Sequence, residues 1–361
     1  MSPYVPIVKA KLNDTQAIVL MSERERSSIK PLFELPISIE NKQASTDASK
    51  AVALLSKRLP DMPFYFDPLN FEAEFRQISS INNLAQIGKK VTPVFGLDRL
   101  PDDVVALRQV LHSYGLKFGI RLELRDISQP EEAWAKVLEY SGRLELSQDS
   151  VELLLDLQYL QPSRLRLTRE AVLDFFLLQP KRFTPGASTL IGSSALGTVA
   201  GVDIDGDARI ERLERELWAW INYELGGTRT IGFGDYGIVN PTFAFSGPNP
   251  NANAKVRYTQ GAVHHVFRGH GLYNPSRFDQ YHELARRVVS SGCFMGAEFS
   301  YGDSYIAACA AGDNGPGNLG TWVKVDMNHH LEVVARQTQN ILRELTQVSS
   351  ARDLKDLLVT E

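Results

Sequence analysis

The sequence predicts an α/β protein: a (β/α)8 barrel of the TIM type over residues 1–243, followed by a smaller C-terminal α+β unit. Three observations lead to this prediction. Eight short apolar runs alternate with longer amphipathic segments, no glycine fingerprint follows the first run, and the composition changes after Pro241. Strand-then-helix order is typical of a parallel sheet, and eight such units close a barrel. An open, doubly wound sheet is the alternative.

The eight apolar runs have the length and composition of buried strands. Each has four to seven residues, is rich in β-branched or aromatic side chains, and is bounded by turn-forming residues. The predicted strands are 4–8, 31–35, 63–66, 92–95, 118–124, 151–157, 188–192 and 228–233.

Between these runs, apolar residues recur three and four positions apart, which is the period of an amphipathic helix. In the segment 104–114, for example, Val104, Leu107, Val110 and Leu111 share one face. The predicted helices are 48–59, 104–114, 133–140, 169–177 and 211–225.

Residues 244–254 are rich in Gly, Pro and Asn and predict a linker or long loop. The C-terminal α+β unit then covers residues 255–361. Its predicted strands are 255–258, 262–268, 304–310 and 321–325, and its predicted helices are 282–290 and 331–346.

Composition excludes several classes of protein. The 361 residues are 43% hydrophobic and 23% charged, as in ordinary globular proteins, and the formal net charge is −4. No global cationic field indicates nucleic-acid or membrane binding. Cys293 and Cys309 are too few for a disulfide framework. No signal-like or membrane-spanning apolar stretch is present, so we expect a cytoplasmic protein without membrane association.

In a barrel, functional residues gather at the carboxyl ends of the strands. The candidate catalytic residues there are Glu34, Asp67, Arg121, Asp156 and Asp235. Converging carboxylates could hold a divalent cation such as Mg²⁺ or Mn²⁺, or serve as acid and base. Lys9, Glu34 and Arg121 lie within apolar strands, and a buried charge demands a partner. A structural network of ion pairs is the alternative interpretation.

A second candidate is an EF-hand-like loop that would bind Ca²⁺. Asp203, Asp205, Asp207 and Glu214 occupy loop positions one, three, five and twelve. Position six is Ala208, where the sharp turn normally requires Gly. The alternative is an acidic loop whose last part caps the following helix.

Six of the seven histidines fall between residues 264 and 330. They could bind a transition metal or form a polar contact surface, although none has the HExxH spacing. The glycine-rich segments 299–303 and 312–318 could cradle an anion or form tight turns. Arg257, Tyr258, Phe267 and Arg268 alternate cations with aromatic rings, which would suit stacking on single-stranded nucleic acid.

Several segments together are similar to the Beta protein family. They are YVPIVKAK and IKPLFELP near the start, GFGDYGIVNP, and RYTQGAVHHVFRGHG, FSYGDSYI and PGNLGTWVKVDMNHHLEVV in the C-terminal part. The resemblance implies a barrel-like α/β fold and members that belong to mobile or anti-phage conflict loci; it carries no catalytic assignment. The family-level binding residues that it suggests are Lys9, Lys11, Arg257, Tyr258, Asp303, Asn318, His329 and His330.

We therefore expect a component of an anti-phage conflict system, with the barrel as a platform for a protein partner or a phage-derived ligand. The alternative is a metal-dependent phosphodiesterase or nuclease with its site at the barrel mouth, where a metal ion would activate water. Binding of nucleic acid through residues 257–268 is a third and weaker hypothesis, because the net charge is negative.

Overall fold

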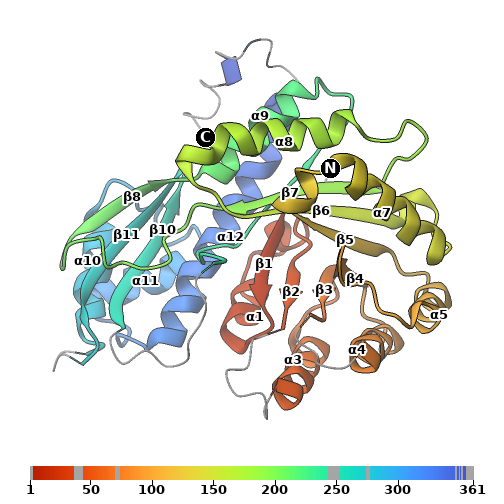
Figure 1. Cartoon of the computed structure of the whole chain (residues 1–361). Helices are drawn as coiled ribbons and strands as arrows, with labels where there is room; N and C mark the ends of the chain where they lie inside the picture. Colours follow the sequence, from red (N-terminus) through yellow and green to blue (C-terminus); the bar gives the residue numbers. More distant parts are fainter. Residues whose placement is uncertain are drawn as a thin grey trace. The chain divides into compact units, whose positions relative to one another are not determined.

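Eight parallel strands form a closed barrel in the computed structural model (Figure 1). The structure describes residues 3–35, 44–69, 74–242, 252–273 and 277–345, with residues 348, 350, 353 and 354. The barrel strands are, in spatial order, β1 (Val5–Lys9), β2 (Leu32–Glu34), β3 (Phe64–Asp67), β4 (Val91–Gly96), β5 (Phe118–Glu123), β6 (Val151–Tyr159), β7 (Ala187–Ser193) and β9 (Gly232–Asp235). The predicted (β/α)8 barrel is confirmed.

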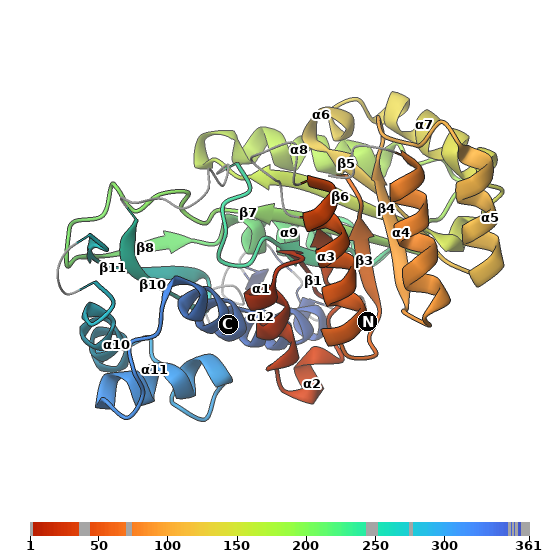
Figure 2. The same ribbon diagram turned by 90° about the horizontal axis from the view of Figure 1, so that it is seen from below.

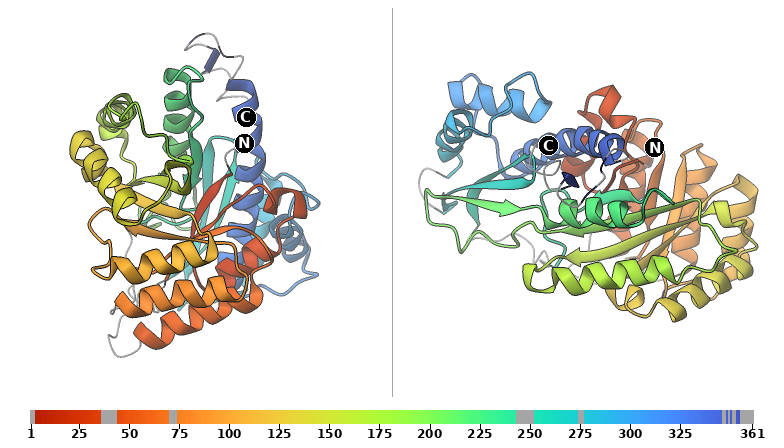
Figure 3. Two further views of the ribbon diagram at one scale, coloured as in Figure 1. Left: turned by 90° about the vertical axis from the view of Figure 1, so that its right-hand side faces the viewer. Right: turned by 90° about the horizontal axis from the view of Figure 1, so that it is seen from above.

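The barrel helices cover the outside of these strands (Figures 2 and 3). They are α3 (Ala44–Arg58), α4 (Glu74–Gln86), α5 (Val104–Tyr114), α6 (Leu124–Ile127), α7 (Pro130–Arg143), α8 (Leu165–Leu177) and α9 (Leu213–Glu224), with short 3-10 turns at Gln148–Ser150 and Pro162–Arg164. Helix α5 shows why the sequence folds this way. The Asp103 side chain caps the start of α5 by accepting a hydrogen bond from the backbone N–H of Ala106. Gly115, in the left-handed conformation, ends the helix.

Apolar side chains fill the barrel interior. The buried interior cluster consists of Val5, Ile7, Leu32, Tyr65, Val94, Leu154, Ile191 and Tyr236. The last barrel strand begins later than the predicted segment 228–233. The backbone of Ile231 is instead bound by side chains of α9, donating to Asn222 Oδ1 at 2.8 Å and accepting from Trp218 Nε1 at 2.7 Å.

The chain divides into two compact units, and each is assembled from separate segments. The first contains Met1–Lys11, Ile29–Gly192 and Leu217–Tyr236; the second contains Leu12–Ser28, Ser193–Glu216 and Gly237–Glu361. This differs from the single boundary that the sequence predicted. Residues 244–251 of the predicted linker lie outside the described residues, and Asn253 and Ala254 already belong to a strand.

The second unit is built on an antiparallel sheet of three strands, in the order β10 (Asn253–Gln260), β11 (Val263–Gly271) and β8 (Asp207–Glu211). Its helices are α1 (Leu12–Val19), α2 (Glu23–Arg26), α10 (Gln280–Ser290), α11 (Tyr301–Ala311) and α12 (Leu319–Glu344). Helix α12 packs against β10, α11 and α1. The Nδ2 atom of Asn328 on α12 donates to the carbonyl of Ala17 on α1 at 2.9 Å, which explains why α1 belongs to this unit.

Two predicted strands are helices in the structure. Segment 304–310 lies in α11, where the Ser300 side chain caps the first turn by accepting from the backbone N–H of Asp303 at 3.1 Å. Segment 321–325 forms the start of α12, where Asn318 and Thr321 make a capping box. Caps and packing of the helix therefore override the β-branched residues in both segments. Among the described residues, no helix has both the length and the apolar character that crossing a bilayer requires.

Candidate functional site

Charged side chains from several strands meet at the carboxyl end of the barrel. Lys9 ends β1, Glu34 ends β2 and Asp67 ends β3, and the parallel register pairs these positions in turn. Arg121 of β5 and Asp156 of β6 complete the set from across the barrel. The sequence predicts these side chains at one barrel mouth, and the structure brings these five together.

The guanidinium of Arg121 uses all five of its N–H donors in this set. Its Nε and Nη2 atoms donate to Asp156 Oδ2 at 2.9 and 2.7 Å. Its Nη1 atom donates to Glu34 Oε1 at 2.7 Å and to Asp67 Oδ2 at 2.9 Å, and Nη2 also donates to the Tyr236 hydroxyl at 2.9 Å. A guanidinium has five donors and no acceptor, so none remains to bind a ligand.

Two further cations complete the ion pairs. Lys9 Nζ donates to Glu34 Oε2. Arg99 forms a bidentate pair with Asp67, with both N–O distances at 3.1 Å. We call this set the arginine cluster; it consists of Lys9, Glu34, Asp67, Arg99, Arg121, Asp156 and Tyr236. Three cations face three carboxylates, so the cluster is neutral overall when Tyr236 is protonated.

The ion pairs keep the cluster in one protonation state. Burial alone raises the pKa of Glu34, but Arg121 and Lys9 outweigh burial and lower that pKa to about 2. Burial and the Asp156 carboxylate raise the pKa of Tyr236 well above its usual value. The Tyr236 hydroxyl therefore stays neutral and donates to Asp156 Oδ2 at 2.6 Å.

This geometry fits a locked network better than a hydrolytic centre. The guanidinium of Arg121 lies between Glu34, Asp67 and Asp156, where a shared metal ion would otherwise lie. In the described part of the chain, no group of three or more His, Cys, Asp or Glu side chains is arranged to hold a metal ion. A general acid works best with a pKa near the operating pH, and the pKa of Glu34 is far below it.

Asp235 does not join the arginine cluster, contrary to the prediction. Its Oδ1 accepts a hydrogen bond from the Tyr4 hydroxyl at 2.6 Å, and the Tyr4 ring stacks on Phe233. The next residue, Tyr236, faces the barrel interior instead. Neighbouring side chains point to opposite faces of a strand, so only one of this pair can face inward. Sequence reasoning missed Tyr236, and its one signal was an aromatic residue directly after Asp235.

Exposed charged residues also lie at and after the carboxyl ends of β1, β4 and β5. Lys11 follows β1 and is exposed. Arg125, in the short helix that follows β5, forms ion pairs with Asp98 after β4 and with Glu123. We call Lys11, Asp98, Glu123 and Arg125 the barrel rim. These side chains remain accessible in the barrel unit, whereas the donors of Arg121 do not.

The predicted calcium loop is not formed. Asp203 and Asp205 are exposed, and Asp205 pairs with His270 at 2.8 Å. Asp207 is the first residue of β8, and Glu214 is buried at the start of α9. An extended strand therefore separates residues that an EF-hand loop would wrap around one ion.

Three predicted binding residues form a buried hydrogen-bonded chain in the second unit. Asp303 accepts from the Tyr258 hydroxyl at 2.5 Å and from His329 Nδ1 at 2.8 Å. Burial raises the pKa of Asp303, but the hydrogen bond from His329 outweighs it and the pKa is lowered. His329 Nε2 lies within hydrogen-bond distance of the carbonyl oxygen of Thr259, at 2.7 Å. All three side chains are buried, which indicates a structural role.

The expected contact surface of histidines is also absent. His264 and His330 are buried, and both lie within hydrogen-bond distance of the Thr259 hydroxyl, at 3.3 and 2.8 Å. Their rings stack on each other. Hydrogen-bonded histidines inside a core satisfy the rule that buried polar groups are paired.

The proposed stacking surface for nucleic acid is not formed either. Tyr258 and Phe267 are buried, so their rings are not available to bases. Burial lowers the pKa of Arg257, and its backbone N–H donates to Asp326 Oδ2 at 3.0 Å. Arg268 donates to backbone carbonyls, including that of Val199 at 2.9 Å. Asn318, the remaining predicted binding residue, caps α12.

Comparisons with known proteins give two similarities. A family model described as Beta protein matches residues 4–336 of the chain. No curated protein matches the sequence. Among solved structures, the chain is similar to a putative fructose-1,6-biphosphate aldolase from Coccidioides immitis, with a TM-score of 0.36 and 12% sequence identity over 95% of this chain and 92% of that chain.

Proposed function

Starting from a chain that belongs to the Beta protein family, we propose that it is a binding platform of a bacterial or phage conflict system. In this proposal the barrel is a rigid support, and its rim binds a protein partner or a phage-derived ligand. The protein acts in the cytoplasm of the bacterial cell, where such a component would be encountered.

The main support for this proposal is the set of hydrogen bonds that Arg121 makes. All five of its N–H donors are used by the barrel's own side chains, and Glu34 is held ionised by two cations. A group with no free donor, and a carboxylate with no accessible neutral form near neutral pH, do not supply transition-state stabilisation or proton transfer. They do fix the ends of several strands relative to one another, which a binding surface requires.

The barrel rim supports the same proposal. The Arg125 side chain is 58% exposed, and its partners Asp98 and Glu123 are also exposed. Exposed ion pairs contribute little to stability, so these side chains can exchange their partners for groups on another molecule at small cost. Charged rims set specificity and association rate in protein complexes.

The alternative, a metal-dependent phosphodiesterase or nuclease at the barrel mouth, has less support. It needs Glu34, Asp67, Asp156 and Asp235 to share an ion. Three of these carboxylates bind Arg121, and Asp235 binds Tyr4 on the other face of its strand.

Phage plating on bacteria that carry the gene with its flanking genes tests the proposal. Arg125→Glu reverses a rim charge and is expected to restore phage plating. Arg143→Glu is the matched control, because Arg143 is an exposed arginine of α7 with one helical ion pair to Glu139. This control should leave protection intact.

Glu34→Gln separates the two functions. It removes a carboxylate that a hydrolase would need, but Arg121 keeps its ion pairs with Asp67 and Asp156, which still join their strands, and the rim residues are unchanged. Protection that survives Glu34→Gln and is lost in Arg125→Glu supports the platform. Loss in Glu34→Gln with a folded protein, together with Mn²⁺-dependent hydrolysis of bis(p-nitrophenyl) phosphate by the wild type, would establish the hydrolase instead.

A further inference from the structure

The second unit contains a pocket of about 490 Å³ that the barrel-mouth proposal does not use. It is lined by strands β8, β10 and β11, by the end of α10 and by residues 291–293 that follow it, all within the second unit. This volume is within the range of small-molecule sites, roughly 300–1,000 Å³. The pocket therefore has room for a ligand the size of a small metabolite.

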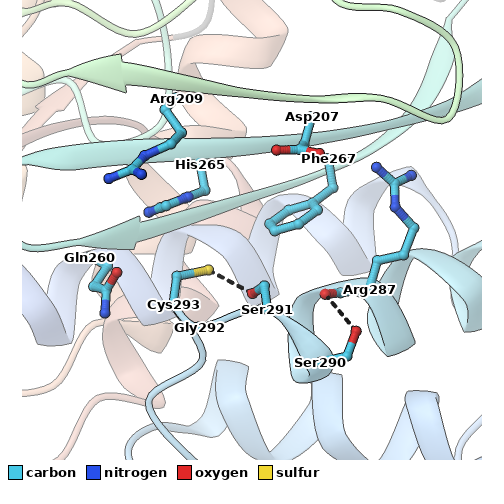
Figure 4. A pocket seen from close by; sticks show the side chains of 10 residues that line it. All are labelled: Asp207, Arg209, Gln260, His265, Phe267, Arg287, Ser290, Ser291, Gly292 and Cys293. Atoms are coloured by element: carbon cyan, nitrogen blue, oxygen red, sulfur yellow. Dashed lines mark hydrogen bonds between the residues drawn. The ribbon is translucent and has the colours of Figure 1, made fainter.

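Side chains from two walls face this pocket. Figure 4 shows Arg209, His265 and Phe267 projecting from the strands toward the segment that holds Ser291 and Cys293. Ser291 Oγ and Cys293 Sγ lie 2.9 Å apart. Burial raises the pKa of Cys293, so its thiol is protonated and presents no negative charge to the pocket.

Two arginines, Arg209 and Arg287, line the pocket. Arg209 is exposed, and no hydrogen bond or ion pair of its side chain is found among the described residues. Arg287 is fixed in place by donating to the carbonyls of Arg268 and Gly206, at 3.1 and 2.8 Å. One acid, Asp207, lines the pocket against these two arginines.

His265 supplies a second observation that points to a ligand in this pocket. Its Nε2 atom is buried and has no hydrogen-bond partner in the part of the chain that the structure describes. Burial, followed by the positive charge of Arg209, lowers the pKa of His265, which favours the neutral ring. Buried polar atoms are normally paired, and an unpaired one at a functional site calls for an occupant.

We infer that this pocket binds a small molecule that carries a phosphate group, with Arg209 and His265 contacting its oxygens and Arg287 adding positive charge. Guanidinium groups bind phosphate oxygens through charge-assisted hydrogen bonds. The Ser290 and Ser291 hydroxyls donate to the carbonyls of Arg287 and Val288, so the arginines carry the recognition of phosphate. The carboxylate of Asp207 gives the ligand's hydroxyl groups an acceptor. This binding site is independent of the barrel rim and would remain if the platform proposal failed.

Calorimetric titration of the full chain tests this inference. The probes are pyrophosphate, ribose 5-phosphate and adenosine 5′-monophosphate, with ribose as the uncharged comparison. We expect one site that binds at least one phosphate probe and does not bind ribose. Arg209→Ala should weaken that binding about tenfold or more, because it removes a charge-assisted contact.

Arg286→Ala is the matched control. Arg286 is the neighbour of Arg287 on α10, is exposed, pairs with Glu283 and does not line the pocket. Its removal should leave the affinity unchanged. The inference is overturned if no probe binds at millimolar concentration, or if Arg209→Ala binds as tightly as the wild type while its melting temperature shows that it is folded.

Discussion

At the scale of single residues, Arg121 holds the barrel mouth together. It is nearly fully buried and touches carboxylates from three other strands, β2, β3 and β6. A buried ion pair contributes little compared with an apolar pair of similar shape, but removing one partner leaves uncompensated charge. The sequence indicated this arrangement because a charge within an apolar strand needs a partner. It did not indicate Tyr236, since alternation alone leaves open which of two adjacent residues faces inward.

Arg121→Met should lower the free energy of unfolding by roughly 3–5 kcal/mol, because three carboxylates lose their shared cation. Urea denaturation measures this change. Lys9→Met is the control: the Lys9 side chain is 41% exposed, and we expect a loss of about 1 kcal/mol or less. If Arg121→Met lowers the free energy of unfolding no more than Lys9→Met does, the arginine cluster does not depend on Arg121.

Glu34 should make stability depend on acid pH. The pKa of Glu34 is lowered from 4.5 to about 2 in the folded chain. A lowered folded-state pKa stabilises the protein above the unfolded-state pKa, and this contribution is lost as the pH falls. The difference in unfolding free energy between wild type and Glu34→Gln should therefore shrink by up to about 3 kcal/mol between about pH 5 and pH 2. Denaturation at several pH values checks this, and a pH-independent difference would contradict it.

At the scale of elements, the barrel strands were predictable and two C-terminal helices were not. The strands of the barrel are short apolar runs with turn residues at both ends, which is a strong local signal. In α11 and α12 the local signal is mixed: Val323 and Val325 favour a strand, whereas the Asn318 cap favours a helix. The cap and the packing of α12 against β10 and α11 decide the outcome.

Asn318→Ala should destabilise the protein by about 1 kcal/mol, because the Asn318 side chain accepts from the backbone N–H of Thr321 at 3.1 Å and its loss uncaps α12. Asn314→Ala is the control, since Asn314 is an exposed loop residue and no side-chain hydrogen bond of it is found among the described residues. Urea denaturation of both variants measures the effect. Equal losses would mean that the cap does not contribute.

At the scale of the whole molecule, neither unit is a continuous stretch of sequence. The second unit takes α1 and α2 from near the start of the chain and joins them to α12. The Asn328–Ala17 hydrogen bond spans 311 residues, and Glu332 accepts from the backbone N–H of Ser22 across 310 residues. Such contacts leave no periodic pattern in the sequence. Composition therefore predicted one boundary, whereas the chain passes between the two units several times.

A fragment of residues 1–243 should therefore fail to fold cooperatively. It would keep α1, α2 and β8 but lose α12, which packs against α1 and α2, and β11, which pairs with β8. Apolar residues such as Ile18 would lose their covering. Thermal unfolding by circular dichroism compares the fragment with the full chain. A sharp transition at the midpoint of the full chain would contradict the division into two discontinuous units.

The central claim is that a guanidinium, and not a metal ion, joins the carboxylates at the barrel mouth. Calorimetric titration of Mn²⁺ into the full chain, with Asp67→Asn beside the wild type, tests it most directly. We expect no binding that depends on Asp67, because Arg121 and Arg99 already occupy its oxygens. One Mn²⁺ bound per chain in the wild type and lost in Asp67→Asn would contradict the claim.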